Sequence, residues 1–163
     1  MDKSHEMSIN YTKGDATNPV GDDKKIIVHV CNDLGKWGKG FVLAISKRWK
    51  SPEQQYKTAF LEESKPSLGD VQFILVESDL TVANLIGQHG IKTARSKSAL
   101  PPIRYEAIEE GLKKVADFAA KNKASVHMPR IGCGLAGGNW QEIEPIINRT
   151  LISKDISVTV YDF

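Results

Sequence analysis

The sequence predicts an α/β protein in which a mixed, mainly parallel sheet of six strands is covered by helices on both faces. Three observations predict this fold. Apolar runs rich in β-branched residues alternate with helix-like segments along the chain. Two glycine-rich turns, 35–40 and 132–138, each follow a strand-like run and precede a helix-like run. The 163 residues suffice for one domain with a sizeable core, so we expect a disordered segment 1–7 and a single domain 8–163.

The first half of the chain contains four strand-like and two helix-like runs. A weakly alternating run ends at the turn Lys13–Asp15, and the next run is almost entirely β-formers, as in a strand covered on both faces. A helix opens from the first glycine turn, and Ser51 caps a second helix with Pro52 at its first position. Two further runs flank a turn-like tetrapeptide and predict an antiparallel hairpin. In order, these elements span 8–12, 25–31, 41–49, 51 onwards, 71–76 and 81–86.

The second half adds two helices and two strands. Pro101 and Pro102 introduce a long helix. Its apolar stripe recurs at helical spacing and marks the buried face: Ile108, Leu112, Val115 and Ala119. A strand leads into the second glycine turn, Asn139 caps the next helix, and a final strand closes the chain. These elements span 101–122, 125–131, 139–151 and 156–161.

Composition argues against several function classes. No apolar run approaches the ~18 residues of a membrane span, and the polar start 1–7 is no secretory signal, so we expect a cytoplasmic monomer that contacts no membrane. A formal net charge of +2, with both signs interspersed, argues against a nucleic-acid partner. Cys31 and Cys133 are expected to be reduced. The four histidines share no metal-ligand spacing, so we expect no metal and no cofactor.

The two glycine turns predict a site for a diphosphate. Glycine lacks a Cβ, so its backbone can approach a ligand closely, and successive N–H groups before a helix N-terminus attract phosphate. Both turns follow strands of a parallel sheet, at whose carboxyl edge ligands bind. The cations that could neutralise the ligand are Lys36, Lys39, Lys92, Arg95 and Lys97, although such residues are usually solvated.

Two other interpretations of the second turn are weaker. The spacing Gly132-x-Gly134-x-x-Gly137 matches a dinucleotide-binding fingerprint, but that motif opens a longer fold with an acidic residue about 20 positions on. Here a single strand follows. Cys133 would suit a thiolate nucleophile, but the phosphatase arginine is replaced by Asn139, and an unassisted thiol has a pKa of about 8.5. A small residue packed under the turn is the simpler interpretation.

Four segments, in this order, resemble the macrodomain family. They are Lys13–Thr17, Ile27–Asn32 with the glycine turn, Met128–Leu135 and Val158–Tyr161. The chain is most similar to the branch that contains ADP-ribose-1''-phosphate phosphatases and the terminal ADP-ribose protein glycohydrolase. The resemblance implies that residues 8–163 form one macrodomain, a three-layer α/β/α fold that binds ADP-ribose across the carboxyl edge of its sheet.

The resemblance also implies roles for individual residues. Asp15 would accept a hydrogen bond from the adenine amino group, and Asn32 would orient a hydroxyl or a water beside the distal ribose, the one not attached to adenine. Tyr161 or Phe163 would wall the adenosine side. The implied ligand-binding residues are Gly14, Asp15, Ala16, Asn32, Gly38, Gly40, Phe41, Ile131, Gly132, Cys133, Gly134, Leu135, Ala136 and Tyr161.

The implied chemistry leaves several functions open. The glycohydrolases use a lysine and an aspartate where this chain has Gln88 and Ala136, which can be neither amine nucleophile nor general base. Phosphatase members carry a histidine at the position of His29, and histidine can exchange protons near neutral pH. One hypothesis is a hydrolase that removes a terminal phosphate or ester-linked ADP-ribose, with Asn32 and His29 as catalytic residues. The second is a module that binds ADP-ribose or ADP-ribosylated protein without turnover, and the third is a nucleotide oxidoreductase.

Overall fold

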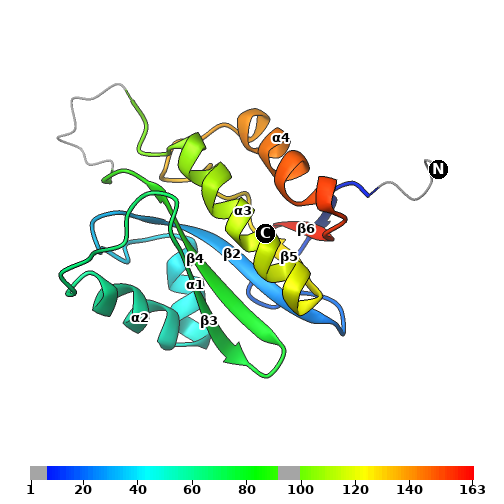
Figure 1. The fold of residues 1–163 in the computed structure, drawn as a ribbon, viewed down its shortest axis with the longest axis horizontal. Helices are drawn as coiled ribbons and strands as arrows, with labels where there is room; N and C mark the ends of the chain where they lie inside the picture. The colour runs from blue at the N-terminus through cyan, green and yellow to red at the C-terminus, as the bar shows by residue number, and fades with distance from the viewer. Residues whose placement is uncertain (1–6, 92–99) are drawn as a thin grey trace.

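A six-stranded sheet forms the centre of the computed structural model, which describes residues 7–91 and 100–163 (Figure 1). The strand order is β1-β6-β5-β2-β4-β3, and all neighbours are parallel except β3 and β4, which confirms the mixed, mainly parallel sheet and its hairpin. The strands are β1 (Asn10–Lys13), β2 (Lys24–Asn32), β3 (Val71–Glu77), β4 (Leu80–Gln88), β5 (Ala124–Met128) and β6 (Val158–Asp162). Residues 1–6 of the expected disordered segment and the cations Lys92, Arg95 and Lys97 lie outside the described residues.

Helices cover both faces of this sheet, which gives the expected three layers (Figure 1). They are α1 (Phe41–Arg48), α2 (Ser51–Ala59), α3 (Tyr105–Asn122), α4 (Trp140–Thr150) and the short 3₁₀ helix η2 (Ile152–Lys154). The neighbours Ile26 and Ile27 in β2 belong to opposite core clusters, because successive strand residues point to opposite faces. Ile26 packs with α3 and α4, and Ile27 with α1 and α2.

Several element boundaries differ from those expected. β5 ends at Met128, because the chain turns away from the sheet at Pro129, so the loop after β5 begins three residues earlier than predicted. Ser51 is the first residue of α2 and makes no capping bond, and α3 begins only at Tyr105. The expected Asn139 cap is confirmed, since its side chain accepts a hydrogen bond from the Gln141 amide at 2.9 Å.

Gly111 lies where α3 approaches β4 most closely. A Cβ at this position would lie 2.4 Å from Cγ of Leu85, which is fully buried. Alanine is the better helix former by about 1 kcal/mol, but overpacking a core costs about 1–3 kcal/mol. We therefore expect Gly111→Ala to lower the free energy of unfolding by up to about 2 kcal/mol in a urea titration. Lys113→Ala, on the exposed side of the same helix, should change it by less than about 0.5 kcal/mol. An equally stable Gly111→Ala would show that Leu85 can move aside.

Candidate functional site

Three loops meet at the carboxyl edge of the parallel strands. They follow β1, β2 and β5, and the last two contain the first glycine loop (Gly35–Gly40) and the second glycine loop (Gly132–Gly138). Two cavities open between them, and both are lined by Gly40, Phe41 and Pro129, so they are adjoining parts of one groove.

The two cavities differ in size and lining. The Asp15 cavity, of about 780 Å³, is lined by Gly14, Asp15, Ala16, Thr17, Gly40, Phe41, Leu43, Ala44, Lys47, Arg48, Pro129, Tyr161 and Phe163. The glycine-loop cavity, of about 280 Å³, is lined by His29, Val30, Lys39, Gly40, Phe41, Val42, Gln88, Pro129, Arg130, Ile131, Gly132, Gly134, Leu135 and Ala136. The groove thus brings together eleven of the fourteen residues expected to bind ligand. Asn32, Gly38 and Cys133 line neither cavity.

Asp15 is held in place by its neighbours. Its Oδ1 accepts hydrogen bonds from the Thr17 amide at 2.9 Å and from the Thr17 hydroxyl at 2.7 Å. Arg48 donates from Nε to the Thr17 hydroxyl at 2.9 Å and places its Nη2 3.8 Å from Oδ2 of Asp15. The hydrogen bonds from Thr17, helped by the Arg48 charge, hold the pKa of the Asp15 carboxyl below its usual range. The carboxylate is therefore ionised at neutral pH, and its Oδ2 faces the Arg48 guanidinium at 3.8 Å.

Tyr161 forms part of the wall of the Asp15 cavity. The residue is 4% exposed, and its ring lies so close to Gly14 that a Cβ there would lie 3.5 Å from Cδ2 of the ring. Phe163 lines the same cavity. This end of the groove therefore combines an aromatic wall with a fixed carboxylate.

Asn32 shapes the first glycine loop from within. Its Oδ1 accepts hydrogen bonds from the Leu34 amide at 2.9 Å, the Lys36 amide at 3.3 Å and the Tyr56 hydroxyl at 2.8 Å. Its Nδ2 donates to the Lys36 carbonyl at 2.6 Å. The second hydrogen on Nδ2 of Asn32 has no acceptor among the described residues. The contact of Asn32 with a ribose stays a prediction, whereas its bonds within the loop are a finding.

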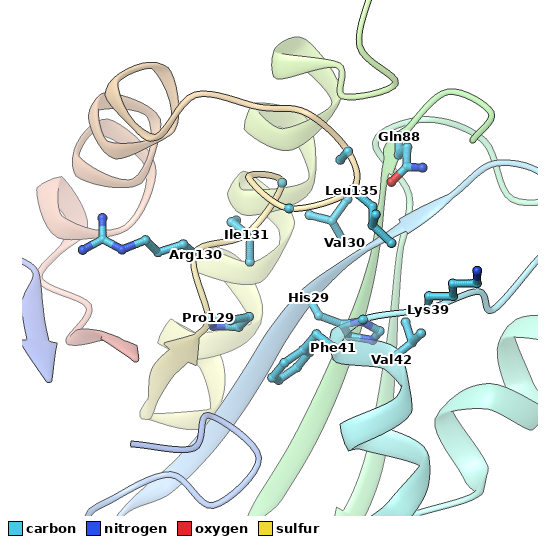
Figure 2. A pocket seen from close by; sticks show the side chains of 14 residues that line it. His29, Val30, Lys39, Phe41, Val42, Gln88, Pro129, Arg130, Ile131 and Leu135 are labelled. Carbon is cyan, nitrogen blue, oxygen red and sulfur yellow. The ribbon is translucent and has the colours of Figure 1, made fainter. Parts of the chain in front are cut away.

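His29 lines the glycine-loop cavity beside Phe41 (Figure 2). The centre of its ring lies 5.9 Å from that of Phe41 and 5.4 Å from that of Trp37. The amide nitrogen of Asn84 donates to the Pro52 carbonyl at 3.1 Å, so its Oδ1 faces His29 and accepts from Nε2 at 2.6 Å. Burial lowers the pKa of His29 to about 4. A ring of this pKa is neutral at pH 7, and the catalytic role expected of His29 stays a prediction.

No carboxylate of a described residue lines the glycine-loop cavity. Gln88 lines it and donates from Nε2 to the Gly90 carbonyl at 2.9 Å, and the apolar side chains of Leu135 and Val30 also line it (Figure 2). Arg130 extends away from it (Figure 2). Lys39 is therefore the one cation of the described residues that lines this cavity and has no partner among them.

The second glycine loop is closed by its own backbone. The Gly138 amide donates to the Gly132 carbonyl at 2.7 Å, and the Gly137 amide to the Gly134 carbonyl at 3.0 Å. Cys133 is half-buried within this loop, and burial raises the pKa of its thiol. The raised pKa favours a packed, unreactive thiol at Cys133. Cys31 and Cys133 are both free and form no disulfide.

Sequence reasoning missed three side chains that shape the groove. Thr17 and Arg48 fix Asp15, as described above. Arg130 lies 5.2 Å from the Tyr11 ring centre and 5.1 Å from that of Trp140, and its Nε bonds Asp162 at 2.7 Å, which fixes the base of the second glycine loop. A local signal exists for Thr17 alone, because a threonine two residues after an aspartate favours a side-chain turn.

Neither a metal site nor a membrane span emerges from the described residues. Residues 7–91 and 100–163 contain no group of three or more His, Cys, Asp and Glu side chains that could hold a metal ion. Within the same ranges, every helix is too short or too polar to cross a membrane.

Two solved structures are similar to this chain over nearly its whole length. No protein-family model matches the sequence. A protein of unknown function from Bacteroides thetaiotaomicron is 57% identical, with a TM-score of 0.92 over 96% of this chain and 99% of that one. A macrodomain protein from Streptomyces coelicolor is 51% identical, with a TM-score of 0.84 over 96% of this chain and 99% of that one.

Curated relatives extend the comparison. Chromodomain-helicase-DNA-binding protein 1-like of Mus musculus is 38% identical over 96% of this chain, which spans only 18% of that protein. The ADP-ribose 1''-phosphate phosphatase of Candida albicans is 28% identical over 83% of this chain and 89% of its own. The ADP-ribose glycohydrolase OARD1 of Bos taurus is 25% identical over 97% of this chain and 93% of its own. Because half of its residues match a macrodomain protein over almost the full length of both, this chain belongs to the macrodomain family.

Proposed function

We propose that this chain binds ADP-ribose in the groove and hydrolyses a derivative of it at the distal ribose. The observation that carries the proposal is the continuity of the two cavities, with an ionised carboxylate in one and two glycine loops around the other. The relatives named as an ADP-ribose 1''-phosphate phosphatase and an ADP-ribose glycohydrolase support both the ligand and the reaction class.

Binding would follow from the chemistry of each part of the groove. Oδ2 of Asp15 would accept a hydrogen bond from the adenine amino group, while Tyr161 and Phe163 cover the adenosine. Gly40 precedes α1 and offers no side-chain cap, so the first N–H groups of that helix are available to the diphosphate. The distal ribose would then lie in the glycine-loop cavity, beside Lys39.

Hydrolysis at the distal ribose needs a nucleophile and a proton acceptor. The described residues that line the cavity supply no carboxylate, and burial lowers the pKa of His29 to about 4, which makes its ring a weak proton acceptor. The nucleophile would therefore be water. It would attack the phosphorus of ADP-ribose-1''-phosphate, or the acyl carbon of an ester-linked ADP-ribose, and break the bond between that atom and the ribose oxygen. The proton of the water would pass through a phosphate oxygen of the ligand to the ribose oxygen, which leaves as a hydroxyl. Asn32 would act on this step through the shape of the first glycine loop.

A second candidate function is a module that binds ADP-ribose or ADP-ribosylated protein without turnover. It is favoured because no described residue that lines the glycine-loop cavity has a carboxylate. Incubation with ADP-ribose-1''-phosphate and with ester-linked ADP-ribosylated protein separates the two. We expect release of phosphate or of ADP-ribose, measured by chromatography. No product at stoichiometric protein, with ligand binding intact, would leave the binding module.

Calorimetric titration with ADP-ribose, AMP and NAD tests the ligand. ADP-ribose is expected to bind more tightly than NAD, because the nicotinamide of NAD would have to enter the small glycine-loop cavity. Comparable or tighter binding of NAD would overturn both candidates and favour the oxidoreductase.

Asp15→Ala tests the adenine contact. We expect ADP-ribose to bind more weakly by about 1–3 kcal/mol, the range for a hydrogen bond to a charged group, which is about fivefold to 150-fold in Kd. Calorimetry on both proteins gives the ratio. Asp22→Ala removes an exposed carboxylate from the same β1–β2 connection and should leave Kd unchanged. An unchanged affinity in Asp15→Ala would defeat the assignment.

A further inference from the structure

His127 lies in β5, away from both cavities, yet it is linked to the ligand groove by hydrogen bonds. The residue is 3% exposed. Its Nδ1 lies 2.7 Å from the hydroxyl of Tyr161, and its Nε2 lies 2.8 Å from the hydroxyl of Ser125. Tyr161 in turn lines the Asp15 cavity.

One arrangement of protons satisfies every member of this chain of bonds. The Ser125 hydroxyl donates to the Lys24 carbonyl at 3.4 Å, so its oxygen accepts from Nε2–H of His127. Nδ1 is then unprotonated and accepts the hydroxyl hydrogen of Tyr161. Burial lowers the pKa of His127 to about 4, so the neutral ring that this arrangement requires is the one present at pH 7.

The Tyr161 hydroxyl holds the loop that presents Asp15. Its oxygen accepts a hydrogen bond from the Val20 amide at 3.0 Å, at the far end of that loop. At the near end, the Gly14 amide donates to the Asp162 carbonyl at 2.9 Å. The loop therefore lies between two anchors, both of which belong to β6.

We propose that His127 is a positioning residue for purine recognition, which orients the Tyr161 hydroxyl and thereby fixes the loop that carries Asp15. The inference rests on the proposed binding of ADP-ribose. Since the hydroxyl hydrogen of Tyr161 is used by His127, Tyr161 offers the ligand its ring and no donor. Replacement of His127 would shift Asp15 and would therefore weaken the preference of the protein for adenine over other purine bases.

The test compares the Kd of ADP-ribose with that of its hypoxanthine analogue, in which a carbonyl replaces the adenine amino group. Wild-type protein should prefer ADP-ribose by about tenfold to hundredfold, because hypoxanthine offers Asp15 no amino donor there. His127→Phe should reduce this preference at least about fivefold. A partly unfolded sample lowers both affinities equally, so the ratio reports the position of Asp15 and not the amount of folded protein.

Two further variants make the result specific. Tyr161→Phe keeps the ring and removes the hydroxyl, so it should lose the same preference, and the double variant should lose no more than either single one. Tyr161→Phe also carries the test if His127→Phe does not fold. Thr150→Val removes a buried hydrogen bond of 2.7 Å to Ile146 in α4 and should keep the wild-type preference.

Each outcome decides between the claims. A wild-type preference retained in Tyr161→Phe and in folded His127→Phe would overturn the positioning role while leaving ADP-ribose binding in place. Equal affinities of the wild-type protein for the two nucleotides, or no binding of either, would overturn adenine recognition by Asp15 and this inference with it.

Discussion

Gly138→Ala is expected to abolish ligand binding and to lower the free energy of unfolding by about 2–4 kcal/mol. A Cβ on Gly138 would lie 2.4 Å from the carbonyl oxygen of Gly132, the atom to which its own amide donates at 2.7 Å. Backbone cannot rotate away as a flexible side chain would, so the second glycine loop must open. The same Cβ would also lie 2.6 Å from Cδ1 of the buried Ile103.

Gly134→Ala is the matched control in the same loop. A Cβ there meets no atom within 4 Å, and the residue does not have a positive φ. Its free energy of unfolding should stay within about 0.5 kcal/mol of wild type. Urea titration and calorimetry with ADP-ribose measure both effects. If Gly138→Ala unfolds like Gly134→Ala and binds ligand within threefold of wild type, the closed loop is not what shapes the groove.

The parts of the fold that the sequence predicts are those encoded by neighbouring residues. The apolar run of β2 has no polar face because helices cover both sides, and its neighbours Ile26 and Ile27 confirm this. Asn139 caps α4 through a bond to an amide two residues on. The glycine loops are equally local, because positive φ at Gly40 and Gly132 requires glycine.

The chemistry of the site depends on contacts between distant residues, and local patterns do not predict these. The bond between Arg48 and Thr17 joins residues 31 positions apart, and that between His29 and Asn84 joins residues 55 apart. A histidine in an apolar run suggests either a proton carrier or a core residue. The pKa of His29 is lowered by its burial, which depends on the packing of distant segments and not on neighbouring residues. A phosphate-binding glycine loop is thus easier to predict from the sequence than the protonation state of a buried histidine beside it.

Acid is expected to destabilise this protein steeply below pH 6.5, because two buried histidines resist protonation. Burial lowers the pKa of His29 and of His127 from 6.5 to about 4. Between pH 6.5 and pH 4, the two histidines therefore bind protons in the unfolded chain but stay largely unprotonated in the folded protein. The stability that each neutral ring contributes is complete above pH 6.5 and is lost as the pH falls toward 4, at about 1.4 kcal/mol per pH unit.

The free energy of unfolding should thus fall by about 3–5 kcal/mol between pH 7 and pH 4.5, as measured by urea titration. His127→Phe should be less stable at pH 7 but should lose about half of this pH dependence, because only His29 still resists protonation. Stability that is flat from pH 7 to pH 5 would mean that both rings accept protons in the folded state. In that case His29 would be free to exchange protons beneath the glycine-loop cavity, and its catalytic role would again be the better explanation of turnover.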